Sequence, residues 1–389
     1  MRIAMVGTRG APARYGGFET CVEEVGARLA DAGHDVTVYC RGALPQERYA
    51  TFRGMRLVHL PALRRRSLET LSHTGISVAD LVARRDSDVA LVFNAANAPF
   101  LPVLRARGVP VATHVDGLEW QRSKWGGAGR RYYRLAESLA VRWSDALIAD
   151  SVGIQDYYRD EFDADTELIS YGAPVLQDVG DELIRPLGLS PRGYHLVVAR
   201  FEPENHVDLI VEGYTRSAAT LPLVVVGSAP YADEYTSRIA RLADERVRLL
   251  GAVWDQEQLD QLYAHCRTYW HGHSVGGTNP SLLRALGAGA PTNAYDVRFN
   301  REVALETAHY FSTPDQVAAL AVEAEGDRGA TVERGLAGQL RAKDYDWNDV
   351  ATSYETLCRS LVHGERSRRR PHGRRRAPAT TSRFGGGRS

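Results

Sequence analysis

The chain has 389 residues, 44% of them hydrophobic, which is long enough for two α/β domains that each bury a core. Its formal charge is zero but unevenly spread: +1 over residues 1–172 (22 basic, 21 acidic), −9 over 173–363 (17 against 26) and +8 over 364–389 (nine Arg, one Glu). Four cysteines without paired spacing favour a reduced, cytoplasmic setting and argue against a metal cluster. No apolar run approaches the ~18 residues of a membrane span, and no signal peptide is expected.

The first half opens with the pattern of a βαβ unit. Residues 3–6 are predicted as a buried strand, a helix is predicted from about Glu19 to Leu29, and residues 36–40 are the next strand. The glycine-rich loop between the first strand and the helix lies where open α/β sheets bind ligands, although an ordinary βα turn is the alternative. Its glycines do not form the dinucleotide fingerprint G-x-G-x-x-G, which disfavours a dehydrogenase.

Further strands are predicted at residues 57–60, 89–93, 109–113 and 146–149. His114 and Asp116 follow the strand at 109–113 and alternate along one extended edge, so both can face the same side. Polar residues at strand ends in a doubly wound sheet are candidate site residues. The alternative is a pair of loop residues that only hydrogen-bond to the backbone.

A second α/β series is predicted from residue 194, with strands at 195–199, 223–226, 247–250 and 268–270. Arg200 comes at the end of the first of these strands. An arginine facing a cleft is a natural bidentate partner for phosphate, whereas a surface salt bridge is the alternative.

The stretch from His271 to Glu302 combines a strand end, a polar turn at 274–279 and a helix start. Asn279 is predicted as the N-cap and Pro280 as the first helical residue. Such a turn offers free backbone N–H groups and the positive end of a helix dipole to an anion. We interpret it as a diphosphate site, with an ordinary strand-to-helix connection as the alternative.

The last predicted helix begins at Trp347, and the Arg-rich residues after Gly364 cannot bury a core. The tail is expected to be disordered and to attract an anionic membrane surface, whereas nucleic acid is not an expected partner because Phe384 is its one aromatic residue. The predicted divisions are an acceptor-side domain, a linker, a donor-binding domain, a returning helix and the tail: residues 1–172, 173–193, 194–345, 346–363 and 364–389.

Several long motifs resemble one family of enzymes. They are GTRGAPARYGGFET at 7–20, HVDGLEWQRSKW at 114–125, ISYGAP at 169–174, RFEPEN at 200–205, HSVGGTNPSLL at 273–283 and FNREV at 299–303. In this order they are similar to the family-four retaining glycosyltransferases, and in particular to a bacterial subgroup that includes rhamnosyltransferases of cell-surface polysaccharides. The resemblance covers residues 1 to about 361.

The resemblance implies the α/β fold called GT-B, in which two Rossmann-like, doubly wound domains face a cleft and a C-terminal helix returns to the first domain. It implies a sugar-nucleotide donor on the second domain, an acceptor on the first, and neither a cofactor nor a metal. Neither Asp-x-Asp sequence, at 86–88 and at 163–165, ends a predicted strand as in metal-dependent enzymes of the other fold.

The resemblance also assigns roles to residues. His114 and Asp116 would lie near the reacting sugar, and Arg200 would neutralise the leaving diphosphate. Charge that develops as the glycosidic bond breaks is best stabilised by such preorganised groups. The residues assigned to the donor phosphates lie in the two glycine turns: Gly16, Gly17, Gly276, Gly277, Thr278 and Asn279.

Three donor-site positions depart from the family pattern. Asn205 stands where many members have a lysine, and Gly276 and Arg284 stand where many have glutamates eight positions apart. Arg284 is the important departure, because a guanidinium cannot accept a hydrogen bond from a ribose hydroxyl.

We therefore expect a metal-independent retaining glycosyltransferase, cytoplasmic or at the inner face of the plasma membrane. Its donor would be a nucleotide-diphosphate sugar, dTDP-rhamnose first and UDP- or GDP-hexoses next, and its acceptor a glycan or lipid-linked glycan. One alternative is an isomerase like the nucleotide-sugar 2-epimerases. Another is a non-catalytic scaffold whose donor site has decayed at Arg284.

Overall fold

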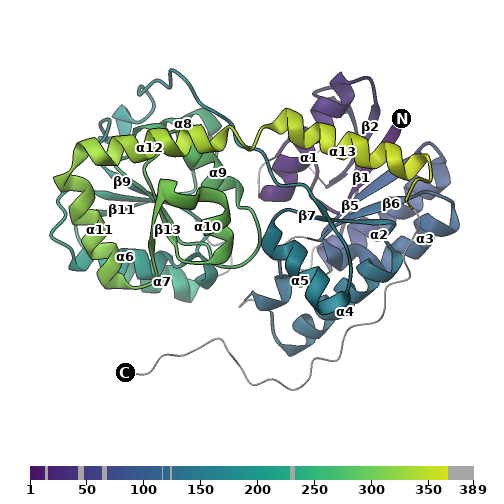
Figure 1. The fold of residues 1–389 in the computed structure, drawn as a ribbon, viewed down its shortest axis with the longest axis horizontal. Helices are drawn as coiled ribbons and strands as arrows, with labels where there is room; N and C mark the ends of the chain where they lie inside the picture. The colour runs from purple at the N-terminus through teal and green to yellow at the C-terminus, as the bar shows by residue number, and fades with distance from the viewer. Residues whose placement is uncertain are drawn as a thin grey trace.

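The structure is a computed structural model that describes residues 1–13, 16–42, 48–63, 68–115, 117–122, 125–227 and 233–366. It consists of two α/β lobes joined by two chain crossings (Figure 1). Each lobe is built on its own predominantly parallel sheet with helices on both faces. These two sheets confirm the predicted fold class. None of the described helices is both long and apolar enough to span a membrane.

The first domain contains an eight-stranded sheet in the order β3-β4-β2-β1-β5-β6-β7-β8. Its pairs are parallel except for the short hairpin β3–β4. The central strands are buried on both faces and rich in Val, Ile and Leu, as expected for a covered parallel sheet. The strands are β1 (Arg2–Val6), β2 (Asp35–Arg41), β3 (Thr51–Phe52), β4 (Met55–Leu60), β5 (Val89–Phe93), β6 (Val111–His114), β7 (Ala146–Ala149) and β8 (Glu167–Leu168). The helices are α1 (Gly17–Asp31), α2 (Glu69–Arg84), α3 (Leu101–Ala106), α4 (Gly127–Trp143) and α5 (Val152–Phe162).

The second domain contains a six-stranded parallel sheet in the order β11-β10-β9-β12-β13-β14. Its strands are β9 (His195–Val198), β10 (Leu223–Val226), β11 (Val247–Gly251), β12 (Tyr269–His271), β13 (Thr292–Tyr295) and β14 (Ala308–Phe311). Its helices are α6 (Val207–Arg216), α7 (Asp233–Leu242), α8 (Gln256–His265), α9 (Pro280–Gly287), α10 (Arg298–Ala304), α11 (Pro314–Gly326) and α12 (Arg328–Ala342).

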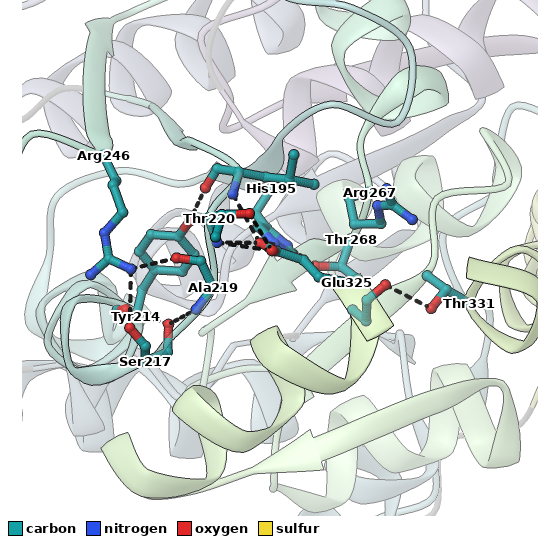
Figure 2. A network of polar contacts seen from close by, with 12 residues as sticks. His195, Tyr214, Ser217, Ala219, Thr220, Arg246, Arg267, Thr268, Glu325 and Thr331 are labelled. Atoms are coloured by element: carbon teal, nitrogen blue, oxygen red, sulfur yellow. Dashed lines mark hydrogen bonds and ion pairs between the residues drawn. The ribbon is translucent and has the colours of Figure 1, made fainter. Parts of the chain in front are cut away.

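A polar network connects β9 to α11 and to the segments that precede β10 and β12 (Figure 2). The buried His195 ring lies 2.7 Å from Thr268 Oγ1 through Nδ1 and 3.2 Å from Glu325 Oε1 through Nε2. The Glu325 carboxylate also accepts from the backbone N–H groups of Thr220 and Leu221. The groups at this end of the core therefore pair with one another, as buried polar groups must.

The final helix, α13 (Trp347–Val362), follows the second domain in the sequence but packs on the first domain beside α1 (Figure 1). Its contacts include Arg28 Nε to Asn348 Oδ1 at 3.0 Å and His34 Nε2 to Glu355 Oε1 at 2.9 Å. Next to it the two crossings run together, because the Ala173 N–H donates to the Tyr345 carbonyl at 2.7 Å. The last helix thus closes the core of the first domain.

Candidate functional site

A cleft of about 1940 Å³ is lined by residues of both domains. Its walls come from the carboxyl ends of β1 and β2 and the start of α1 on one side, and from the loops after β9 and β11 and the start of α9 on the other. Open parallel sheets bind ligands at these strand ends. Six of the residues predicted from the sequence line the cleft: Gly16, Gly17, Arg200, Asn205, Asn279 and Arg284.

The two predicted glycine turns meet across the cleft. A Cβ at Gly17 would lie 3.1 Å from Cγ of Pro280, so the loop before α1 touches the first residue of α9. Gly16 has φ +131°, a conformation that a side chain would strain. The approach of the first loop to the second domain therefore depends on both glycines.

The turn at Gly276–Thr278 is held against the first domain. The Oγ1 of Thr278 donates to the Asp150 carbonyl at 2.6 Å, and a Cβ at Gly277 would lie 1.8 Å from Asp150 Oδ1. All three residues of the turn are buried and do not line the cleft. The residues of this segment that line the cleft come next along the chain, among them Asn279 and Ser281.

The start of α9 has the predicted cap. Asn279 Oδ1 accepts from the Ser281 N–H at 3.0 Å, and Pro280 is the first helical residue. The cap fixes the direction of the first helical turn, and with it the positive end of the helix dipole at the cleft wall.

Asn205 braces the loop that carries Arg200. Its Nδ2 donates to the Arg200 carbonyl at 2.7 Å, and its Oδ1 accepts from Nδ1 of His273 at 2.6 Å. The side chain of Arg200 is 41% exposed, and Nη2 lies 3.8 Å from Glu202 Oε2. An ion pair of this length is weak. Asn205 therefore holds the Arg200 loop and connects it to His273.

Arg284 faces the cleft from α9 and forms an ion pair with Asp260 of α8. Both side chains are about four-fifths buried, at 23% and 20% exposure. The positive charge that replaces the expected glutamate is therefore balanced locally. The sequence does not predict Asp260 as the partner of Arg284, because two residues 24 positions apart leave no periodic pattern.

His114 does not lie where the sequence analysis expected it. The residue is 2% exposed, and its ring is surrounded by those of Phe18, Phe93, Tyr171 and Tyr354 at centroid distances between 5.6 and 6.3 Å. It is absent from the residues that line the cleft. The prediction that it faces the reacting sugar is corrected to a place in the aromatic core under α13. Asp116 lies outside the described residues.

Arg122 is a cleft residue that the sequence analysis did not assign. Its Nε lies 2.7 Å from Glu119 Oε1, and its Nη1 lies 3.8 Å from carboxylate oxygens of Glu202 and Glu204 in the other domain. Glu202 is also the partner of Arg200. The motif that contains His114 could have indicated it, but the pairing across the cleft is set by tertiary structure alone.

The histidine that ends β12 and the one two residues later are neutral at physiological pH. Burial lowers the pKa of His271 to about 3, and burial together with Arg122 lowers the pKa of His273 well below its ordinary value. Both line the cleft, where a neutral ring can donate and accept one hydrogen bond each. Within the described ranges, no group of three His, Cys, Asp or Glu side chains could hold a metal ion.

Two family models match successive parts of the chain. Residues 16–172 match the model described as "Glycosyl transferase 4-like domain", and residues 181–324 match "Glycosyl transferases group 1". Each half of the chain therefore matches a glycosyltransferase domain model, and the two domains together have the GT-B fold.

Solved structures share this fold. A sucrose-phosphate synthase from Thermosynechococcus elongatus has a TM-score of 0.79 at 18% identity, covering 93% of this chain and 99% of that one. The Anabaena HepE protein in complex with UDP-glucose has a TM-score of 0.73 at 18% identity, covering 92% and 99%. At this identity the likeness concerns the fold alone.

Curated relatives match shorter regions. An O-antigen chain mannosyltransferase B of Escherichia coli is 25% identical over 176 residues, which are 42% of this chain and 45% of the relative. The GtfA subunit of a peptide N-acetylglucosaminyltransferase of Streptococcus gordonii is 28% identical over 118 residues, 29% of this chain and 22% of that protein. The chain therefore spans less than half of each of these relatives.

Proposed function

We propose that the protein is a retaining glycosyltransferase that moves a sugar from a nucleotide-diphosphate donor to a glycan or lipid-linked acceptor of the cell surface. One observation carries the proposal: a single cleft brings Arg200 and the start of α9 from the second domain against the Gly16–Gly17 loop of the first. The donor binds on the second domain and the acceptor on the first.

In the proposed reaction, Arg200 pairs with the diphosphate, and the positive end of α9 stabilises the charge that develops on it as the glycosidic bond breaks. Asn205 and His273 hold the Arg200 loop in place. The Gly16–Gly17 backbone approaches the bound sugar because neither residue has a side chain. Contact between the two domains excludes water, which would otherwise compete with the acceptor.

The donor and the location are proposed in finer detail. Rhamnose carried on dTDP is the first candidate, supported by the motif resemblance, and the UDP-glucose bound by the Anabaena structure makes UDP-hexoses the next. The mannosyltransferase relative supports an acceptor in polysaccharide synthesis. The Arg-rich tail would attach the cytoplasmic enzyme to anionic lipid; residues 367–389 lie outside the described ranges.

The test is a panel of sugar nucleotides incubated with the protein and a glycolipid acceptor extract, with EDTA present throughout. Nucleoside-diphosphate release that depends on the acceptor is the expected result, and retention is read from the anomeric configuration of the product. Conversion of the donor without acceptor would favour the isomerase instead. Absence of both binding and turnover with every donor would leave only the scaffold role.

A further inference from the structure

Two arginines line the first-domain half of the cleft at a place that the donor does not occupy in the proposed reaction. Arg9 follows β1 and Arg41 ends β2, and the Arg41 N–H donates to the Arg9 carbonyl at 3.0 Å. This bond sets the two residues side by side at adjacent strand ends. The Arg9 N–H donates at 3.0 Å to the Glu19 carboxylate in the first turn of α1. The two arginines therefore lie near the start of α1, next to the Gly16–Gly17 loop.

The environment of Arg41 is the stronger indication of an anion site. Its side chain is 11% exposed, and its Nε is buried without a hydrogen-bond partner among the described residues, although Nη2 donates to Thr70 Oγ1 at 3.0 Å. Burial lowers the pKa of its guanidinium, and the nearby Glu69 opposes this. A buried cation with an unsatisfied donor costs free energy, which an anionic ligand would recover.

The carboxylate between the two arginines is loosely held. Glu69 Oε2 lies 3.8 Å from Arg9 Nη2 and 3.9 Å from Arg41 Nη1, and the Glu69 side chain is 36% exposed. Ion pairs of this length and exposure contribute little stability. Glu69 is also in the first turn of α2, whose N-cap Leu68 offers no side-chain acceptor. Its carboxylate can swing out and leave both guanidinium groups and the helix start to another oxyanion.

We propose that Arg9, Arg41, Thr70 and the start of α2 form a subsite for an anionic group of the acceptor, either a phosphate or a sugar carboxylate. The inference rests on the proposed function, because it assumes that the first domain holds the acceptor. It assigns to that acceptor a negative charge a short distance from the hydroxyl that is glycosylated. Bidentate recognition by paired arginines suits both kinds of oxyanion.

The experiment is a binding titration of the full chain with its donor site filled by the nucleoside diphosphate found in the donor screen. Three probes are used: inorganic phosphate, glucuronate, and glucose as the uncharged reference. We expect one of the two anions to bind and glucose not to, and which anion binds tighter identifies the source of the charge. R41Q should weaken that binding about tenfold, as expected for one charge-assisted hydrogen bond.

Further variants keep the test independent of folding. R9Q, at a side chain that is 45% exposed, should also weaken anion binding, whereas E69Q should tighten it by removing the competing carboxylate. R301Q, on α10 outside the cleft, is the matched control and should change nothing. Equal anion affinity in the wild type and R41Q, or no anion binding at all, overturns the subsite. Absence of nucleotide binding would instead count against the proposed function.

Discussion

At the scale of single residues, the cleft depends on how tightly each cation is already paired. Arg200 has a carboxylate at 3.8 Å, whereas Arg284 is in direct contact with Asp260. The contact of Arg200 with Glu202 is therefore the longer one, and the charge of Arg284 is balanced within the cleft wall. Two arginines of the same cleft therefore differ in how closely a carboxylate is paired with them.

We expect R200A to lower kcat about a hundredfold, because one preorganised group that stabilises transition-state charge contributes on this scale. Initial rates of nucleoside-diphosphate release measure the loss. R216A, on α6 outside the cleft and paired with Glu212 of the same helix, is the matched control. A wild-type rate in R200A would mean that the leaving group is stabilised elsewhere.

R284E is expected to fail as a repair of the donor site when made alone. The new carboxylate would face Asp260 across the space that the guanidinium now fills, and two carboxylates that share a site without a cation repel. R284E combined with D260N removes the repulsion. We expect the single variant to melt at a lower temperature than the double one, and only the double variant to bind the donor more tightly. Equal melting temperatures would show that the Arg284–Asp260 contact has no energetic weight.

At this scale the sequence predicts the residues at strand ends but not their partners. Arg200, Asn279 and the Gly16–Gly17 turn can be placed at the cleft from the sequence, because strand, turn and cap chemistry is local in sequence, whereas Gly276–Thr278 are buried beside the cleft. The contacts of Asp260, Arg122 and Asp150 join segments that are distant in the sequence. No pattern in a single sequence predicts such contacts. His114 was misplaced because a polar residue at a strand end looks the same whether it faces a cleft or an aromatic core.

At the scale of elements, the strands were predicted more accurately than the helices that cover them. Short Val- and Leu-rich runs mark buried parallel strands, and predicted runs such as 3–6 and 223–226 match β1 and β10. Helices such as α11 and α12 were not predicted, because α12 carries exposed Leu336 and Leu340 and so lacks a clean apolar stripe.

The His195–Glu325 network predicts acid sensitivity of the second domain. Burial would raise the pKa of Glu325, but hydrogen bonds from His195, Thr220 and Leu221 outweigh it and lower the pKa to about 2, from an ordinary 4.5. A lowered folded pKa stabilises the fold above pH 4.5, and this contribution is lost as the pH falls from 4.5 towards 2. The E325Q variant should lose about 1–3 kcal/mol at pH 7, and the difference from wild type should shrink below pH 4.5.

Thermal unfolding at a series of pH values checks this prediction. E323Q, a change at a more exposed position of the same helix, is the matched control and should behave as the wild type near neutral pH. A difference between E325Q and the wild type that stays constant from pH 7 to pH 3 would contradict the linkage.

The last helix should behave as part of the first domain. Tyr354 is fully buried in the cluster that also holds Ile3 and Met5, and its ring lies 6.3 Å from that of His114. Y354A should destabilise the first domain by about 3–5 kcal/mol, whereas Y354F, which keeps the ring, should cost about 1 kcal/mol. Hydrogen exchange would report the loss in β1 and β5, with β9 and β10 unchanged. Equal losses in both domains would contradict the assignment of α13.

At the scale of the whole molecule, the two domains are joined by more than the chain crossings. Val152 and Gly153 at the start of α5 donate backbone N–H groups to the Glu302 carboxylate of the second domain, at 2.6 and 3.2 Å. Thr278 and Pro280 add the contacts on the cleft side. The cleft is therefore shaped by interactions that a change in domain orientation would break.

Arg122 connects the two domains beside Arg200. It holds Glu119 of its own domain and lies 3.8 Å from Glu202 and Glu204 of the other, all at 21% exposure or less. Without this guanidinium the three carboxylates would lose a shared cation, and Glu202 would keep Arg200 as a partner at 3.8 Å. Glu202 would then compete with the diphosphate for Arg200, and repulsion among the carboxylates would favour an open cleft.

We expect R122Q to raise KM for the donor about tenfold, the effect of losing one charge-assisted contact, with a smaller change in kcat. Added salt should reduce the difference, because it screens the carboxylates at the edge of the cleft. R134Q, which removes an arginine stacked on Trp120, is the matched control and should leave KM unchanged. An R122Q enzyme with wild-type KM at low salt would show that Arg200 binds the diphosphate independently of the charges that link the domains.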